Sequence, residues 1–419
     1  MISPFWTGLR LAAACLIAAA WQLGADGAAW AQQPPPAAAP APGAAAPAPA
    51  APTSNAMTNP SMAGPLVANP DPMHLDITPF FGPLYVTGAV SGLALFQTDP
   101  VFGNKGANLD ISNAQAILQT TSGWFQFFFE PGIYSFPTVG VPYTKMPATV
   151  NGTFGGLPVA WGKIVFNDNF NIQGGKLPTL MGAESAFTFQ NMNIERGLLW
   201  NQENIVNQGV QANLTTGPVA WAVSLNDGFY SGQFNYLSGS ATWTVDPANS
   251  FVLAGMGPAS RVTSAGPPTT PAAPEFNNSM MIEAAYTYNA APWTITPYLQ
   301  YSQTDGDKAF LPALVSSSTF GGAVLANYSI NDNVNLAGRW EYIGSSGAGT
   351  VGGSGPLGYG PGSSAMSFTL TPTYQNGIYF LRGEASVVDL TSFTKGFGFG
   401  TSGGTSTQAR FLIETGIVF

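Results

Sequence analysis

Segments of about ten residues in which apolar and polar side chains alternate recur from residue 74 to the end of the chain. In residues 365–375 the even-numbered positions hold Met, Phe, Leu, Pro and Tyr, whereas Ser, Thr and Gln occupy the odd-numbered positions from 367 onward. Residues 334–342 alternate in the same way, with Trp340 between Arg339 and Glu341. A period of two puts alternate side chains on opposite faces of a β-strand. The sequence therefore predicts strands with one apolar face and one polar face.

The predicted strands are joined alternately by short turns and by long, irregular connections rich in Gly or Pro. The short turns lie at residues 121–123, 167–169, 216–218, 246–249, 289–292, 331–333 and 376–377. This pattern gives about sixteen strands and is typical of an up-and-down antiparallel barrel in the outer membrane. In such a barrel the short turns and both chain ends lie on the periplasmic side.

The composition favours a membrane location for this barrel. Of the 419 residues, 45% are hydrophobic and only 8% are charged, against roughly 25% charged residues in soluble domains. A helical membrane protein needs repeated apolar runs of about 20 residues, and the only such run lies between Leu9 and Leu23. A soluble β-sandwich alternates similarly, but aromatic residues near strand ends, such as Trp293 and Tyr301, favour a lipid-facing band. We therefore predict an all-β transmembrane up-and-down antiparallel β-barrel.

The N-terminal part of the chain has a different composition. Residues 1–31 contain one cation, Arg10, before an apolar stretch, and they end on the small residues that a signal peptidase accepts, so we predict cleavage after Ala31. Residues 32–73 are almost wholly Pro, Ala, Gly and small polar residues, which predicts a disordered periplasmic leader before a barrel at 74–419. Cys15 could instead be a lipoprotein attachment site. After cleavage the chain has no cysteine for disulfides or thiolate metal sites.

The last strand resembles the C-terminal signal of proteins that the barrel-assembly machinery inserts into the outer membrane. One face of this strand is apolar as far as the terminal residue, and we assign the assembly signal to Phe411, Ile413, Ile417 and Phe419. The strand then ends in the periplasm.

The longest polar-rich connection, residues 177–204, joins the fifth and sixth predicted strands. It is too long for a turn and too apolar for solvent, with Phe187, Phe189 and Trp200 beside its charged residues. We therefore expect it to fold into the barrel lumen as a constriction loop. The predicted constriction residues, for which we favour ion selectivity over structural pairing, are Glu184, Glu195, Arg196 and Glu203.

Charged residues on the predicted strands fall on the face that would line the lumen. Charge on the lipid face would cost about 2–4 kcal/mol at the bilayer midplane. For these wall residues we favour structural pairing over ion selectivity, although both remain open. The predicted pore-lining residues are Glu130, Lys163, Glu283, Arg339, Glu341, Arg382, Glu384, Arg410 and Glu414.

Four short stretches resemble the signature of the OmpL-like β-barrel porin family. They are residues 175–179 (GKLPT), 189–191 (FQN), 193–202 (NIERGLLWNQ) and 225–228 (LNDG), and the resemblance is strongest across residues 157–228. It implies an outer-membrane barrel that acts as a porin, and it implies no substrate or catalytic residue. By analogy, a constricting loop occupies a similar place in the strand order of trimeric general porins.

The leading functional hypothesis is passive diffusion of small hydrophilic solutes or ions through the lumen. The net charge of −9 gives weak support for cation preference. The alternative is a plugged structural or adhesive barrel that its Pro/Ala-rich leader links to the cell wall. An outer-membrane hydrolase is disfavoured because a serine hydrolase needs a histidine base, and His74 is the only histidine and lies at the predicted periplasmic end.

We predict no cofactor and no metal site. Residues 305–307 (DGD) resemble part of a calcium loop but lack its later ligands and closing Glu. Nucleic acid is an unlikely partner because Lys and Arg are scattered thinly. The expected partners are outer-membrane lipids, the barrel-assembly machinery and small hydrophilic solutes, and association into a homotrimer stays open.

Overall fold

The computed structural model describes residues 64–78, 82–261, 274–307, 315–346 and 357–419, all within one compact unit, Pro52–Phe419. The predicted signal peptide and most of the predicted leader lie outside these residues. None of the helices in the described ranges is long and apolar enough to cross a bilayer.

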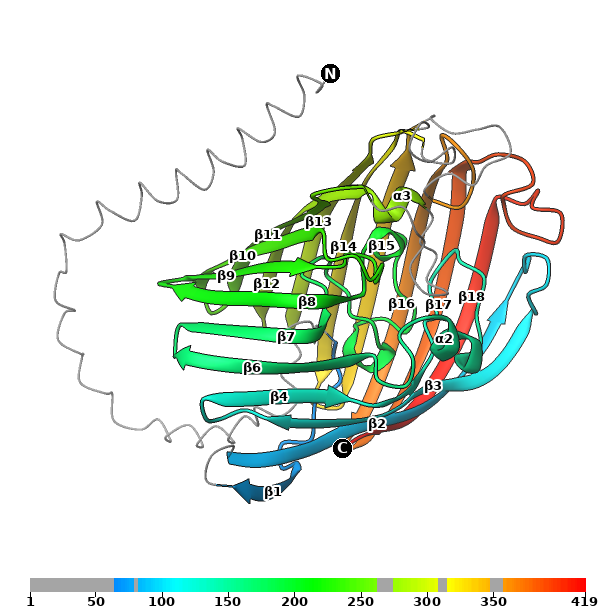
Figure 1. The fold of residues 1–419 in the computed structure, drawn as a ribbon. Helices are drawn as coiled ribbons and strands as arrows, with labels where there is room; N and C mark the ends of the chain where they lie inside the picture. Colours follow the sequence, from blue (N-terminus) through cyan, green and yellow to red (C-terminus); the bar gives the residue numbers. More distant parts are fainter. Residues whose placement is uncertain (1–63, 79–81, 262–273, 308–314, 347–356) are drawn as a thin grey trace, which may run out of the picture. The chain divides into compact units, whose positions relative to one another are not determined.

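The described residues form eighteen antiparallel strands (Figure 1). Strands β4 and β5 are two pieces of one barrel strand, interrupted at Pro131. Strand β1 pairs with β2 alone and lies outside the ring, so the closed barrel has sixteen strands. Strand β18 pairs with β2 and closes the barrel. The bounds are β1 Met73–Thr78, β2 Gly82–Gln97, β3 Ala107–Thr120, β4 Phe125–Glu130, β5 Gly132–Tyr134, β6 Val159–Asn167, β7 Phe170–Pro178, β8 Val206–Thr216, β9 Val219–Asn226, β10 Tyr236–Asp246, β11 Asn249–Pro258, β12 Ser279–Ala290, β13 Trp293–Thr304, β14 Ser317–Asn331, β15 Val334–Ser345, β16 Ser364–Asn376, β17 Tyr379–Ser392 and β18 Thr407–Val418. This confirms the predicted barrel and its strand number.

The seven predicted short turns all coincide with connections between paired strands, and they lie at one end of the barrel, the turn end. The longer connections lie at the opposite end, the loop end. They contain the helices α2 (Met146–Gly152) and α3 (Pro274–Asn277), and the 3-10 helices η1 (Thr188–Gln190) and η2 (Trp200–Gln202). The terminal Phe419 exchanges two backbone hydrogen bonds with Gly88, which fixes the C-terminus at the turn end.

The alternation in sequence becomes an alternation in burial. In β16, Phe368 is 52% exposed on the outer face, whereas Thr369 and Thr371 are fully buried on the inner face. Aromatic side chains pack on the outer face near the strand ends, as Trp293 does against Tyr328 with ring centroids 4.7 Å apart. An apolar outer band with aromatic rings near its ends suits a lipid bilayer.

The interior of the barrel is partly filled by the connection between β7 and β8, residues 179–205, which we call the inner segment. Its aromatic side chains Phe187 and Phe189 are buried in one cluster with Phe128 of β4 and Phe380 of β17. The hydrophobic cores therefore lie inside the barrel, between the wall and the inner segment, and they hold this segment in a defined position.

The last residues of the predicted leader, 64–72, contact the barrel wall at the turn end. Leu66 is buried in the same cluster as Phe189 and Val418. The side chain of Gln375 binds both backbone groups of Val67: its Oε1 accepts from the amide and its Nε2 donates to the carbonyl, each at 2.8 Å. These contacts order the chain before β1 begins.

The substitution Gln375→Ala removes both hydrogen bonds to Val67. We expect residues 64–72 to be cleaved several-fold faster by an added protease, because a less tethered segment opens more often, while the barrel stays folded. Limited proteolysis of the refolded protein followed by mass spectrometry measures the rate. Gln408→Ala, which loses a hydrogen bond to the Asp99 carbonyl among the long connections, is the matched control. Equal cleavage of the two variants would contradict the tethering role.

Candidate functional site

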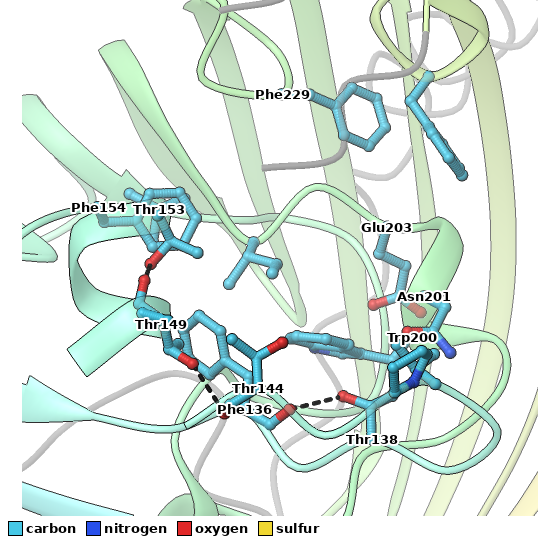
Figure 2. A pocket seen from close by; sticks show the side chains of 17 residues that line it. Phe136, Thr138, Thr144, Thr149, Thr153, Phe154, Trp200, Asn201, Glu203 and Phe229 are labelled. Atoms are coloured by element: carbon cyan, nitrogen blue, oxygen red, sulfur yellow. Dashed lines mark hydrogen bonds between the residues drawn. The ribbon is translucent and has the colours of Figure 1, made fainter. Parts of the chain in front are cut away.

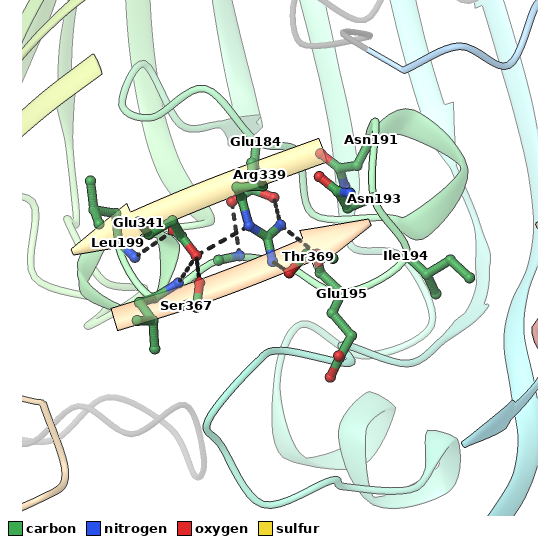
Figure 3. Close-up of polar contacts among 12 residues, drawn as sticks. Glu184, Asn191, Asn193, Ile194, Glu195, Leu199, Arg339, Glu341, Ser367 and Thr369 are labelled. Atoms are coloured by element: carbon green, nitrogen blue, oxygen red, sulfur yellow. Dashed lines mark hydrogen bonds and ion pairs between the residues drawn. The ribbon is translucent and has the colours of Figure 1, made fainter. Parts of the chain in front are cut away.

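A buried guanidinium on the wall connects β15 to the inner segment. Arg339 lies between two carboxylates, with its Nη1 2.6 Å from Glu184 Oε1 and its Nε 3.1 Å from Glu341 Oε2 (Figure 3). The same Nη1 donates to the backbone carbonyl of Glu195 at 2.6 Å, and Nη2 donates to Thr369 on β16. Arg339 thus cross-links two strands and two points of the inner segment.

Two further arginines make the same kind of connection from β17 and β18. Arg382 forms an ion pair with Glu414 and donates to the carbonyls of Thr188 and Asn191 in the inner segment. Arg410 forms an ion pair with Glu195 at 2.7 Å. The ion-pair partner of Arg382 is therefore on the neighbouring strand, rather than at Glu384 two residues along its own strand.

Glu414 also joins several elements by its own hydrogen bonds. Its Oε1 accepts from the hydroxyls of Thr188 at 2.6 Å and Ser91 on β2 at 3.1 Å, and from Asn113 on β3 at 3.3 Å. A carboxylate on the last strand is thus shared by the first two strands of the barrel and by the inner segment.

Wall carboxylates also bind the backbone of the inner segment. Glu384 accepts from the amides of Ile194 at 2.5 Å and Glu195 at 2.8 Å, and Glu341 accepts from the amide of Leu198 at 3.0 Å. A side chain at Gly197 would not fit, because a Cβ there would lie 2.0 Å from Glu341 Oε1. Glycine thus allows the close approach of the segment to β15.

Burial shifts the pKa values of two charged residues in the inner segment. Arg196 lies against the rings of Phe136 and Trp200, at 5.6 and 5.4 Å, and burial lowers its pKa to about 10. Burial raises the pKa of Glu203 well above its usual range, and the negative charges of Glu283 and Glu184 act in the same direction.

The interior that the inner segment leaves free contains two cavities. The loop-end cavity, of about 410 Å³, is lined by aromatic and threonine side chains and by one charged residue, Glu203 (Figure 2). The turn-end cavity, of about 400 Å³, is lined by β11, β12, β13 and the inner segment, and it includes Glu283 and Tyr298.

Gly182 of the inner segment lines the turn-end cavity and lies beside Glu203, which lines the loop-end cavity. Its amide donates to Glu283 Oε2 at 2.5 Å, and a Cβ on Gly182 would lie 1.8 Å from Glu203 Oε2. Its φ of +81° is in the region that favours glycine. Two carboxylates, each bordering one cavity, therefore meet at a residue without a side chain.

The structure separates the predicted charged residues into two groups. Of the predicted constriction residues, Glu184 and Glu195 are ion-paired to the wall, Arg196 is packed under aromatic rings, and Glu203 borders a cavity. The nine wall residues all lie on strands, and eight are buried, whereas Lys163 is half-buried beside the Trp161 ring.

Other residues of the site were not among the predicted site residues. Phe136 and Phe154, which line the loop-end cavity, come from the connection between β5 and β6. From the sequence, this connection was predicted only to be long and irregular. The aromatic content of that connection was the available signal. His74 lies in the exposed strand β1, and no group of metal-ligating side chains occurs within the described ranges.

A closed sixteen-strand barrel with an apolar outer face and charged groups inside is the architecture of a bacterial outer-membrane porin. Residues 83–419 match the family model described as "Putative beta-barrel porin-2, OmpL-like", which covers most of the chain. The protein belongs to this family, and the resemblance found in its sequence is confirmed.

Solved structures share the barrel at low sequence identity. An anion-selective porin from Comamonas acidovorans has a TM-score of 0.56 and 12% identity, over 80% of this chain and 99% of that one. OmpT, an outer membrane protein of Vibrio cholerae, has a TM-score of 0.53 and 12% identity, over 82% and 99%. The outer membrane channel DcaP of Acinetobacter baumannii has a TM-score of 0.53 and 12% identity, over 80% and 97%. The likeness shows the fold alone, and no curated protein matches the sequence.

The substitution Arg339→Gln leaves Glu184 and Glu341 buried without their cation. We expect the free energy of unfolding to fall by about 3–5 kcal/mol, because an uncompensated buried charge is costly. Urea titration of the refolded barrel measures this change. Lys163→Gln is the control, with an expected change of about 1 kcal/mol or less, because Lys163 is half-buried against one ring. Equal losses in the two variants would show that Arg339 does not anchor the inner segment.

Proposed function

We propose that the protein is a porin-like channel for passive diffusion of small hydrophilic solutes or ions across the outer membrane. The observation that carries this proposal is the uneven filling of the barrel. The inner segment binds the wall at β15, β17 and β18. The turn-end cavity, of about 400 Å³, borders the wall at β11 to β13, and the loop-end cavity, of about 410 Å³, lies mainly among the inner segment and the long connections. The description of the family as β-barrel porins supports a channel.

The exposure of inward-facing side chains supports a path along one side of the barrel. Thr369 and Thr371 of β16 are fully buried beneath the inner segment. The corresponding inward positions of β10 and β11, such as Thr242 and Val252, are partly exposed, and Thr244 is exposed. A water-filled route would therefore follow β10 to β13, and the ion-paired side would serve as its rigid wall.

We place the proposed constriction at Gly182. There the side chains of Glu203 and Glu283 approach the proposed path, and we propose these two residues as the constriction residues. Glu184 and Glu195 instead hold the inner segment by ion pairs. This assignment retains one residue of the predicted constriction set, Glu203, and one predicted pore-lining residue, Glu283.

The remaining expectations about the cellular setting are part of the same proposal. The loop end would face the exterior and the turn end the periplasm, after a signal peptide at 1–31 is removed and the barrel-assembly machinery reads the last strand. A trimer form is known for OmpT of Vibrio cholerae, and a homotrimer of this chain is proposed on that likeness.

Conductance of single barrels in planar lipid bilayers tests the channel. We expect stepwise ion currents from the refolded protein. Properly folded protein without such steps would overturn the proposal and favour the plugged structural or adhesive barrel.

A matched pair of substitutions on β12 tests the path. Ala285 borders the turn-end cavity, and Ala284 is exposed on the outer face of the same strand. We expect Ala285→Trp to reduce single-barrel conductance by about half or more, because the larger side chain fills part of the turn-end cavity on the proposed route. Ala284→Trp adds the same side chain on the lipid side and should leave the conductance unchanged. Equal conductance in the two variants would contradict the proposed route.

A further inference from the structure

The loop-end cavity combines aromatic surfaces from separate parts of the chain. Phe136 and Phe154 come from the connection between β5 and β6, Trp200 from the inner segment, Phe229 from the connection between β9 and β10, and Phe276 from α3. Its volume of about 410 Å³ lies within the range of roughly 300–1,000 Å³ that is usual for small-molecule sites. In Figure 2, Trp200, Asn201 and Glu203 lie on one side of the cavity and Phe154 lies on the other.

Glu203 is the one charged side chain among the described residues that line this cavity. It is only 4% exposed, and within the described ranges neither carboxylate oxygen has a hydrogen-bond partner. Buried carboxylates in proteins are almost always paired or hydrogen-bonded, because burial without a partner is costly. Two unpartnered acceptor atoms at the edge of a cavity indicate a place for a donor that carries positive charge.

The hydroxyl groups that line the cavity also favour a ligand that donates hydrogen bonds. Thr138 donates its proton to the carbonyl of Phe136 at 3.2 Å, and Thr149 donates to the carbonyl of Thr144 at 3.1 Å. Their protons are therefore engaged, and they offer oxygen lone pairs to a ligand. Aromatic faces also attract cations.

A buried cation, Arg196, packs behind two of the cavity's aromatic rings. The Arg196 guanidinium lies against the rings of Phe136 and Trp200 but does not line the cavity, and the carboxylates of Glu184, Glu384 and Glu414 act on it. The cavity thus presents acceptors and aromatic faces.

We propose that the loop-end cavity binds an organic cation, a protonated amine on a small aromatic or apolar body, with its ammonium group at Glu203. The apolar body packs among Phe136, Trp200 and Phe229, and the ammonium group donates to the Glu203 carboxylate. Binding of the ammonium group favours the ionised carboxylate, and so it opposes the rise in the pKa of Glu203 that burial and the neighbouring Glu283, Glu184 and Glu341 cause.

The turn-end cavity extends this site toward the other end of the lumen. Beyond Gly182, the cavity is lined by Glu283 and Tyr298. One carboxylate oxygen of Glu283 and the hydroxyl group of Tyr298 have no hydrogen-bond partner in the described ranges. A cation that leaves Glu203 meets a second acidic group before the turn end. This step rests on the proposed channel function, whereas binding at Glu203 does not.

Isothermal titration calorimetry of the refolded full-length protein in nonionic micelles tests the site. The probes are phenethylammonium, neutral 2-phenylethanol and anionic 3-phenylpropionate, which share a phenyl group and differ in charge. We expect phenethylammonium to bind at least about tenfold more tightly than the other two, since a charge-assisted hydrogen bond is lost in both. Equal affinity of the ammonium and the alcohol would overturn the proposal.

Two carboxylate variants locate the contact. Glu203→Gln should remove the preference for the cation, whereas Glu130→Gln should retain it. Glu130 is also buried with one unpartnered oxygen but does not line the cavity. Phe229→Leu should weaken the binding of phenethylammonium and of 2-phenylethanol by a similar factor. This variant tests the site even if Glu203→Gln does not fold. An unchanged preference in folded Glu203→Gln would also overturn the proposal.

Conductance of the same preparations separates this inference from the proposed function. Ion currents without phenethylammonium binding would overturn the cation site and leave the channel. Calorimetric binding without ion currents would support the site and overturn the channel, together with the route past Glu283.

Discussion

Buried ion pairs between the barrel wall and the inner segment are the interaction on which the interior depends. Arg339, Arg382 and Arg410 each bind a carboxylate and a backbone carbonyl of the inner segment or of a connection beside it. Such pairs offset their desolvation only where geometry and additional hydrogen bonds are good, and removing one partner is costly. The three arginines therefore fix the inner segment against one side of the barrel. The turn-end cavity instead borders β11 to β13, which carry none of these arginines.

The ion pairs also divide the carboxylates by role. Glu184, Glu341 and Glu414 are neutralised by arginines on the packed side. Glu203 and Glu283 border the cavities and retain unpartnered oxygens within the described ranges. Two acidic groups without an arginine partner in the described ranges thus border the proposed path. Charge rings of one sign favour counter-ions in other pores.

The sequence was sufficient for the barrel because a strict period of two and the turn residues act locally. The positions of the turns at 167–169 and 376–377 and the number of strands follow from such local patterns. The charge pairing required distances between residues far apart in the chain. Arg382 and Glu384 share a face of one strand, yet the register of β17 with β18 sets Arg382 directly opposite Glu414. The loop-end cavity likewise requires Phe136, Trp200 and Phe276 to come together from three separate parts of the chain. A local sequence pattern cannot predict such an arrangement.

The shared contacts of Glu414 have a consequence for the order of assembly. This residue belongs to the last strand of the chain, and its partners are Ser91 and Asn113 from the first two strands of the barrel and Thr188 from the inner segment. The inner segment cannot be completely fixed until β18 arrives beside β2. The pairing of β18 with β2 that closes the barrel thus also completes the contacts that hold its interior.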